Sequence, residues 1–526
     1  MEDACREIIA HLTHTRFRKS EVIKIKREVC SKFHLKEMPS NTQILMFANP
    51  HEREKLLPLL TRKPTRTISG VTVVAVMTEP YRCPHGRCVY CPGGPRFGSP
   101  QSYTGREPAA MRAIQNDFDP FMQAKNRLLQ LKSMGHKIDK VELIIMGGTF
   151  PAMPLKYQYW FIRRCLDALS GEESKTLEEA KLHAEHAKVR NTGITIETRP
   201  DYSKEYHVDH MLRMGTTRVE LGVQTIYNEI YRIIKRGHTV EDVIDATRVL
   251  KDSGLKVCYH IMPGLPGSDP GKDLEVFGSI FSEHEFKPDM LKIYPCLVLK
   301  GTELYETWQK NEYLPYTTND MILLLSRVLP KLPRWVRIQR VQRDIPAPLI
   351  DDGVKKSNLR EVVLAEMTRK DLVCNCIRCH EVGHMYQKKG IFPEQDNIRI
   401  SVEEYEASEG NELFLSYDDA EQGILVGFLR LRIPSEKAHR PEINMMDSAI
   451  VRELHVYGPI VPVGEEPLDA WQHRGFGKRL LAFAEGIAYE RFDSKKMVIT
   501  SGIGVREYYK HLGYHHEGPY MVKLLG

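Results

Sequence analysis

The sequence predicts an α/β protein with two domains joined by a linker. Between residues 66 and 315, six apolar or β-branched runs alternate with helical patterns, which predicts a partial (β/α)6 barrel of parallel strands. From residue 398 the pattern changes, and several strands surround one long helical run, so a smaller α/β domain is expected over 398–526. Residues 1–65 carry short helical patterns only, and 316–397 form the linker.

The composition is that of an ordinary soluble globular protein. The 526 residues are 42% hydrophobic and 27% charged, with a formal net charge of +6. No run of about 18 apolar residues occurs, and the first residues lack the layout of a signal peptide, so we expect no membrane span and no secretion. With 11 cysteines partly grouped in tight clusters, we expect a cytoplasmic protein that binds metals rather than a disulfide framework.

Basic residues are concentrated in the N-terminal region, with eight lysines and arginines between positions 16 and 36. An excess of this kind on helices fits the phosphate backbone of RNA. A solvated helix face would have the same composition. We therefore expect residues 1–65 to be a tRNA-binding region, with a plain solvated surface as the alternative.

The first barrel strand is predicted at residues 71–77, and the loop after it contains Cys83, Cys88 and Cys91 in the spacing C-x4-C-x2-C. Three thiolates at the end of a buried parallel strand can hold three irons of a 4Fe-4S cluster and leave the fourth iron open. A structural zinc ion would require a fourth ligand, and no fourth cysteine is close in sequence. The loop therefore predicts an iron–sulfur site, with zinc and inert cysteines as alternatives.

The other five barrel strands are predicted at 141–146, 193–197, 218–223, 256–261 and 290–294. Most of these runs end in a polar or glycine-containing turn, of which Gly147-Gly148-Thr149 is one. Because the chemistry of such barrels lies at the carboxyl ends of the strands, we expect these turns to line the same site as the cysteine loop.

The linker contains an arginine-rich run at 334–343, in which four arginines and Trp335 alternate with apolar residues. On a strand, several of the guanidinium groups would share one side, where they would suit RNA phosphates and stacked bases. An ordinary strand whose arginines form salt bridges is the alternative.

A second cysteine cluster follows in the linker, with Cys374, Cys376 and Cys379 in the spacing C-x-C-x2-C. Three thiolates within six residues indicate a tetrahedral zinc site with a structural role. His380, His384 or a more distant histidine would supply the fourth ligand. Reduced thiols on a loop are the alternative.

The strands of the second domain are predicted at 412–416, 424–433, 450–457, 496–501 and 520–525. Between the third and fourth of these, Gln472, Gly475 and Gly477 form a Q-x-x-G-x-G pattern just before a helical run. Glycines at a helix start leave backbone N–H groups free for a pyrophosphate, and the helix dipole assists binding. The pattern resembles the acetyl-CoA loop of the GCN5-related acetyltransferases.

The cysteine loop resembles the signature of the radical S-adenosylmethionine (SAM) superfamily, although its first gap is one residue longer than the usual C-x3-C-x2-C. The chain as a whole resembles the catalytic-subunit family of Elongator, and the lack of long inserts points to a stand-alone archaeal or bacterial type. The matching segments are 83–94, 101–105, 140–150, 193–202, 220–224, 341–346, 453–458 and 518–523.

The resemblance implies that acetyl-CoA and radical SAM chemistry form 5-carboxymethyluridine at the wobble position of tRNA. It implies roles for iron ligands, for SAM-binding residues, for Lys140 as an acetyl-CoA contact near the radical, for a CoA cleft, and for tyrosines at the CoA sulfur or thioester. The iron ligands would be Cys83, Cys88 and Cys91, and the SAM-binding residues Gly147, Gly148 and Thr149. The CoA cleft would contain Glu453, Leu454, His455, Val456, Gln472, Gly475, Phe476, Gly477 and Lys478. The tyrosines would be Tyr508 and Tyr509.

The partners implied are tRNA and an electron donor, and a homo-oligomer remains open. A protein lysine acetyltransferase with a structural iron–sulfur domain is the second hypothesis, and an RNA-binding scaffold is the third. The cysteine loop and the intact glycines argue against the scaffold. Because a carbon radical reacts only with a neighbouring group, we also expect the two domains to share one water-poor chamber.

Overall fold

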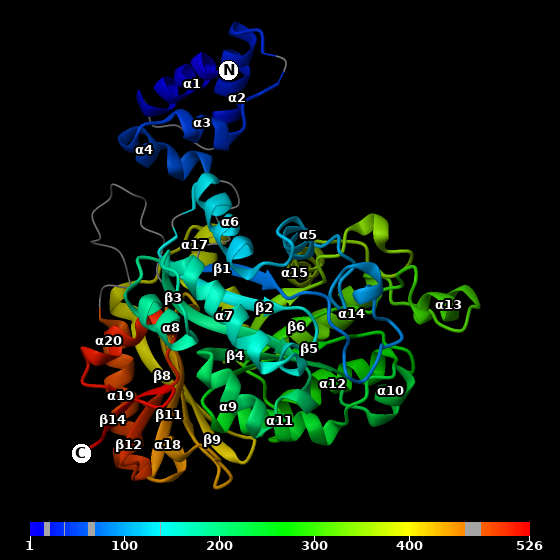
Figure 1. The fold of residues 1–526 in the computed structure, drawn as a ribbon, viewed down its shortest axis with the longest axis vertical. Helices are drawn as coiled ribbons and strands as arrows, with labels where there is room; N and C mark the ends of the chain where they lie inside the picture. The colour runs from blue at the N-terminus through cyan, green and yellow to red at the C-terminus, as the bar shows by residue number, and fades with distance from the viewer. Residues whose placement is uncertain (15–20, 36, 62–68, 137, 458–474) are drawn as a thin grey trace.

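A computed structural model describes residues 1–526 except 15–20, 36, 62–68, 137 and 458–474. It consists of a helical bundle, a parallel sheet surrounded by helices, and a second, mixed sheet (Figure 1). No helix among the described residues is long and apolar enough to cross a membrane.

The N-terminal bundle consists of four helices: α1 (Glu2–His14), α2 (Val22–Lys32), α3 (Asn41–Phe47) and α4 (Pro50–Leu60). Ser40 and Asn49 begin α3 and α4 with capping boxes, which satisfy two backbone N–H groups at each helix start. The bundle has an apolar core of its own and stands clear of the rest of the chain except near α6 (Figure 1). There, Arg53 donates a hydrogen bond of 3.1 Å to the Lys132 carbonyl.

The parallel sheet contains the six predicted strands and one more. Its strands pair in chain order: β1 (Thr72–Met77), β2 (Lys140–Met146), β3 (Arg190–Thr198), β4 (Thr216–Gln224), β5 (Lys256–Ile261), β6 (Met290–Ile293) and β7 (Arg337–Val341). The seventh strand is the arginine-rich run, which pairs in parallel with β6. It joins the sheet because Ile338 and Val341 are buried against the barrel core.

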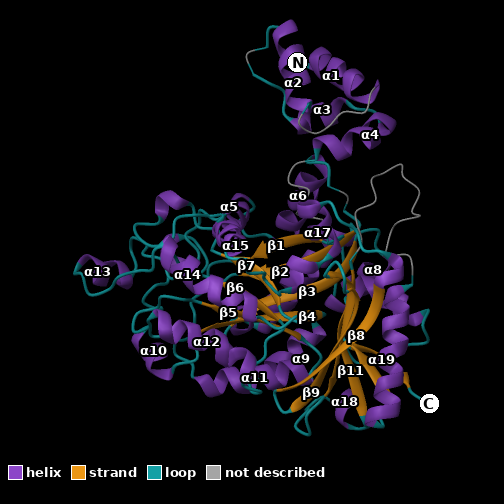
Figure 2. Ribbon diagram, turned by 180° about the vertical axis from the view of Figure 1, so that it is seen from behind, coloured by secondary structure: helices purple, strands orange, loops and turns teal. Residues whose placement is uncertain are grey.

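Helices cover the outside of this sheet (Figure 2). The helices of this part of the chain are α5 (Pro108–Gln115), α6 (Pro120–Ser133), α7 (Leu155–Ser170), α8 (Leu177–His186), α9 (Glu205–Arg213), α10 (Asn228–Ile233), α11 (Val240–Asp252), α12 (Pro270–Ser282), α13 (Glu303–Gln309), α14 (Thr318–Val328) and α15 (Leu359–Arg369). Of these, α13 projects away from the sheet (Figure 1). The short helices α16 (Ile377–His380) and α17 (Val382–Lys389) follow and pack against strands of both sheets.

The second sheet has the order β13-β14-β12-β11-β10-β9-β8. Its strands are β8 (Ile398–Ala407), β9 (Gly410–Asp419), β10 (Ile424–Ile433), β11 (Ser448–Val456), β12 (Lys496–Ile499), β13 (His515–Glu517) and β14 (Tyr520–Leu524). The long helix α19 (Phe476–Phe492) packs on it, with α18 (Pro441–Asn444) and α20 (Arg506–Lys510) at its margins. β8, which the sequence did not predict, is an edge strand.

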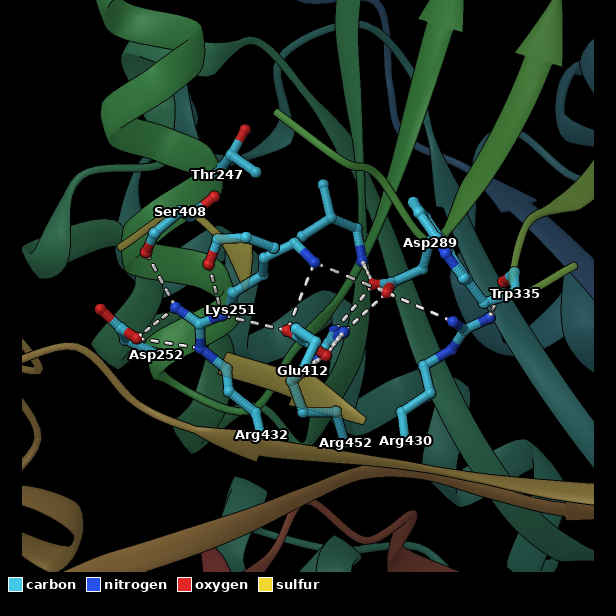
Figure 3. A network of polar contacts seen from close by, with 12 residues as sticks. Thr247, Lys251, Asp252, Asp289, Trp335, Ser408, Glu412, Arg430, Arg432 and Arg452 are labelled. Carbon is cyan, nitrogen blue, oxygen red and sulfur yellow. Dashed lines mark hydrogen bonds and ion pairs between the residues drawn. The ribbon is translucent and has the colours of Figure 1, made fainter. Parts of the chain in front are cut away.

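The second domain lies against the amino ends of the barrel strands. Arg452 on β11 binds both carboxylate oxygens of Asp289, just before β6, at 2.6 and 2.7 Å. Arg432 on β10 binds Asp252 at the end of α11 at 2.7 Å. Glu412 on β9 accepts from both arginines and from Lys251, so the charges form one buried network (Figure 3).

The network joins four cations to four carboxylates when Arg430 and its partner Glu453 are included. All of these groups are largely withdrawn from water, and the loss of one partner would leave an opposite charge buried and unpaired. The two domains are therefore held in one fixed arrangement. Because the cysteine loop follows the opposite, carboxyl ends of the strands, the expected single chamber shared by both domains is not seen among the described residues.

Candidate active site

The cysteine loop follows the carboxyl end of β1, and each of its three sulfur atoms has a polar neighbour. Cys83 lies 3.7 Å from the Thr149 hydroxyl and Cys91 lies 3.5 Å from the Ser102 hydroxyl. Cys88 has His85 Nε2 at 3.2 Å. Cys88 and Cys91 are buried, so the loop presents its thiols to the barrel interior.

The three loop sulfurs do not lie within 4.8 Å of one another, unlike those of the second cysteine cluster. Around a single tetrahedral zinc ion, sulfur atoms would be about 3.8 Å apart, given Zn–S bonds of about 2.3 Å. The wider spacing of Cys83, Cys88 and Cys91 fits a larger iron–sulfur cluster better than one zinc ion.

The glycine turn after β2 lies directly against the cysteine loop. Gly147 and Gly148 have φ values of +133° and +92°, and a Cβ on Gly147 would lie 2.0 Å from the Thr78 hydroxyl. Only glycine fits there, because the conformation is left-handed and the space is already filled. Thr149, the next residue, reaches Cys83. The structure thus brings together the cysteines and the turn expected to bind SAM.

A chamber opens beside this pair of loops, inside the carboxyl end of the barrel. The chamber and its mouth, open to solvent, together contain about 1060 Å³ of space not filled by protein. Cys83, Gly148 and Thr149 line one side, and charged residues of β3 to β7 line the other. The lining thus combines a cysteine and the glycine turn expected to bind SAM with charged side chains that could contact a polar ligand.

The charged wall is a chain of ion pairs across the strands. Lys292 Nζ lies 3.1 Å from Glu197 and forms a closer pair with Glu220, which also binds His260 at 2.9 Å. Tyr103 donates a hydrogen bond of 2.7 Å to Glu197. Burial lowers the pKa of the Lys292 ammonium, but the Glu220 carboxylate outweighs it, and the net pKa lies well above the usual value.

Lys292 therefore stays protonated in the chamber and places a fixed positive charge near the cysteine loop. The sequence did not assign a role to Lys292, Glu197, Glu220 or His260. One signal was present: Arg218 and Glu220 alternate on a strand whose residues are all buried, and buried charges in a parallel strand require partners inside the protein.

Lys140 does not lie near this chamber. It is exposed at the amino end of β2, whereas the glycine turn follows the carboxyl end of the same seven-residue strand. The strand spans about 20 Å at 3.3 Å per residue. The structure therefore does not bring Lys140 together with the cysteine loop, and its expected contact with acetyl-CoA remains a prediction.

In the second domain, the start of α19 faces the end of β11. Gly475 is the left-handed residue before the helix, with φ of +76°. A Cβ on Gly477 would lie 3.5 Å from Val456, 4.0 Å from Leu454 and 3.2 Å from the Tyr508 hydroxyl. Gly477, the end of β11 and the Tyr508 phenol thus lie together where the CoA cleft is expected, with Phe476 buried and Lys478 exposed.

Two predicted members of this cleft point away from it. The Glu453 side chain binds Arg430 at 2.9 Å and lies 4.0 Å from Lys256 on the barrel side, because alternate residues of a strand face opposite ways. His455 likewise stacks against Phe428. Among the other candidates, Tyr509 is buried in the core of the second domain, and Gln472 lies outside the described residues.

The second cysteine cluster has the compactness of a single-ion site. Its sulfur atoms all lie within 4.8 Å of one another: Cys374, Cys376 and Cys379. Arg360 donates hydrogen bonds to two of these sulfurs, at 3.2 and 3.5 Å. Neither nearby histidine completes the site, because His380 binds the Gly423 carbonyl at 2.8 Å and His384 lies 3.2 Å from Glu381.

The predicted RNA-binding arginines of the linker are largely engaged within the protein. Arg337 binds Glu381 and the Tyr457 hydroxyl, which ties β7 to the second domain. Arg334 pairs with Asp418, and Arg343 donates to the Ser102 carbonyl. The alternative of a strand with salt-bridged arginines therefore fits Arg337.

Some basic residues of the N-terminal bundle also make contacts within the protein, and others are exposed. Lys26 is buried and binds Asn41 at 3.0 Å, so it serves the bundle rather than its surface. Lys24 and Arg27 are exposed on α2. Most of the other basic positions from 16 to 36, including Arg16, lie outside the described residues or in local ion pairs.

Comparison with known proteins covers nearly the whole chain. Three family models match: the ELP3 N-terminal domain at residues 1–68, the radical SAM superfamily at 79–276, and the radical SAM C-terminal domain at 288–369. A tRNA uridine(34) acetyltransferase of Methanocaldococcus jannaschii is 56% identical over 491 residues, which are 93% of this chain and 90% of that protein.

Human Elongator complex protein 3 is 45% identical over 531 residues, which cover 99% of this chain and 96% of that protein. Among solved structures, Elp3 of Methanocaldococcus infernus, with residues 1–46 deleted, matches with a TM-score of 0.77 and 50% identity. That match covers 87% of this chain and 100% of the solved chain, so the arrangement described above is shared with an archaeal relative.

Proposed function

The chain belongs to the Elongator complex protein 3 family of radical SAM proteins, and on this premise we propose that it modifies uridine 34 of tRNA, forming 5-carboxymethyluridine from acetyl-CoA. Cys83, Cys88 and Cys91 would hold a 4Fe-4S cluster, and the turn Gly147-Gly148-Thr149 would bind SAM. When bound, the cluster and SAM supply a radical that removes hydrogen from the acetyl methyl group, so that this carbon can add to C5 of uracil.

The observation that carries the proposal is the contact between the cysteine loop and the glycine turn at the mouth of a charged chamber. A neutral base or thioester there would meet the Lys292 ammonium, whose N–H groups can orient a carbonyl oxygen. The Glu197 and Glu220 carboxylates hold this cation in place without neutralising it by proton transfer.

In the second domain, the backbone N–H groups at the start of α19 would receive the CoA pyrophosphate. The Tyr508 hydroxyl lies beside Gly477 and would bond the thioester or CoA sulfur. The compact cluster of Cys374, Cys376 and Cys379 would hold zinc between the two sheets, with Arg360 balancing the charge of its thiolates. An electron donor is also required, and a homo-oligomer is not needed for any of these roles.

The test is anaerobic incubation of the protein with reductant, SAM, acetyl-CoA and tRNA, followed by mass analysis of the tRNA nucleosides. We expect 5-carboxymethyluridine with the wild type and none with Cys88→Ala. Cys165→Ala, which changes an isolated buried cysteine in α7, is the matched control and should retain the product. Product formation by Cys88→Ala would contradict the radical mechanism.

One observation favours the second candidate, a protein lysine acetyltransferase. Helix α19 and the Tyr508 phenol lie on the far side of β11 from the barrel, and Tyr508 is 42% exposed, so a peptide could reach them. Under that hypothesis, acetyl groups would be transferred to lysine peptides rapidly without SAM or tRNA. Under the proposed function, acetyl-CoA hydrolysis rises when tRNA is added, and Tyr508→Phe suppresses that rise.

A further inference from the structure

Arg236 brings a buried positive charge to the cysteine loop. The residue is 8% exposed, and its Nη1 lies 3.6 Å from the Cys88 sulfur. Nη2 donates a hydrogen bond of 2.6 Å to the Gly222 carbonyl on β4. A Cβ on Gly222 would lie only 2.4 Å from Nη2, so glycine at this position makes room for the guanidinium.

The backbone next to Arg236 is also fixed. Its carbonyl accepts a hydrogen bond of 2.8 Å from Arg199, whose guanidinium is itself paired with Asp201 at 2.8 Å. Among the described residues, no carboxylate forms an ion pair with Arg236 within 4.0 Å, and its Nε has no partner. The charge of Arg236 is therefore directed at the cysteine loop instead of being cancelled locally.

His85 supplies a second donor to the same sulfur. It stands in the four-residue gap between Cys83 and Cys88, the gap that is longer than in the usual signature. Its Nε2 lies 3.2 Å from the Cys88 sulfur. A metal-bound thiolate only accepts hydrogen bonds, so Nε2 would carry the proton. Gly237 packs against this ring, since a Cβ there would lie 2.8 Å from the His85 Cβ.

We propose that Arg236, assisted by His85, sets the reduction potential of the iron–sulfur cluster through the Cys88 sulfur. Reduction adds one negative charge to a cluster that is already anionic with three thiolate ligands. A buried cation a few ångströms away stabilises the reduced form more than the oxidised form, and hydrogen bonds to the ligand sulfur act in the same direction. Arg236 is thus a tuning residue, because it acts on the cluster through the sulfur of Cys88.

This inference rests on the cluster proposed above, and the two can be tested separately. Iron content and the electron paramagnetic resonance signal of the reduced wild type test the cluster itself. The potential is then measured by redox titration of the reconstituted protein without SAM, tRNA or acetyl-CoA, so no catalytic step enters the result.

We expect Arg236→Gln to shift the one-electron equilibrium at least tenfold toward the oxidised cluster, which equals a potential about 59 mV lower. Arg236→Lys keeps the charge, so its reduction potential should lie close to that of the wild type. His85→Gln should lower the reduction potential by a smaller amount than Arg236→Gln. Arg232→Gln removes an equal charge from the exposed face of α10 and should leave the potential unchanged.

Equal potentials for Arg236→Gln and Arg232→Gln, at equal iron content, would overturn the proposal. If Arg236→Gln does not hold iron, Arg236→Lys and His85→Gln decide the question by the same titration. If all three variants fail to hold iron, Arg236 and His85 are needed for assembly of the cluster, and the proposal that they control its reduction potential is wrong.

Discussion

Arg452→Met would break the buried network between the domains while nearly keeping the side-chain length. The variant removes two hydrogen bonds to Asp289, at 2.6 and 2.7 Å, and two to Glu412, at 2.6 and 3.2 Å. It also removes one of 3.1 Å to the Leu255 carbonyl. Breaking a buried pair by removing one partner lowers stability by about 3–5 kcal/mol, because the remaining charge loses its compensation. Lys251 and Arg430 stay within 4 Å of Asp289, so we expect the lower half of this range.

The assay is equilibrium denaturation in urea, followed by tryptophan fluorescence. Trp335 reports on the interface, because it stacks on Tyr405 at a centroid distance of 4.3 Å. The matched control is Arg369→Met, which breaks an ion pair whose arginine side chain is 77% exposed and should lower stability by less than about 1 kcal/mol. If both variants unfold at the same urea concentration, the network does not hold the domains together as argued.

Four further predictions concern single sites. Lys292→Met should lower the rate of uridine modification about 100-fold while iron content is retained, because the chamber loses the cation held by Glu197 and Glu220; an unchanged rate would remove Lys292 from the site. Cys376→Ser should lower zinc content and the melting temperature and leave iron unchanged, as measured by metal analysis and calorimetry. Joint replacement of Lys24 and Arg27 by Ala should reduce the salt-dependence slope of tRNA binding by roughly 0.7–0.9 per lost phosphate contact, and an unchanged slope would make α2 a plain solvated face. Burial lowers the pKa of His455 to about 4, so below about pH 6.5 the unfolded chain binds a proton that the folded chain does not. The free energy of unfolding should therefore be greatest above about pH 6.5 and fall by up to about 3 kcal/mol towards pH 4. His455→Gln should reduce this loss.

The barrel strands were predictable because strands buried on both faces are nearly continuous apolar runs, as in β5 and β6. β8 was missed because Glu403, Glu404 and Glu406 interrupt the alternation of its apolar residues, which is typical of an edge strand facing water. β7 was recognised as strand-like, but its place beside β6 depends on a pairing that no local pattern encodes.

The cysteine loop and the glycine turn were predictable because each is a short contiguous motif. The chamber wall was not, because Glu197 and Lys292 are 95 positions apart and each looks ordinary alone. The placement of the second domain depends on contacts such as Arg452 to Asp289, which are 163 positions apart. Lys140 could be placed at the start of the second strand from the sequence, but its distance from the cysteine loop depends on the fold.

The buried network also limits how the two halves of the protein can cooperate. Domains in one chain usually move relative to each other unless their interface is large or strongly bound. Here a hinge motion would have to separate Arg452 from Asp289 and Arg432 from Asp252, all of which are fully buried. The cleft at α19 and the loop at Cys88 therefore keep a constant separation through a catalytic cycle. Any transfer between them therefore depends on the movement of a flexible ligand arm, a single loop or the RNA itself, and not on the rotation of one domain against the other.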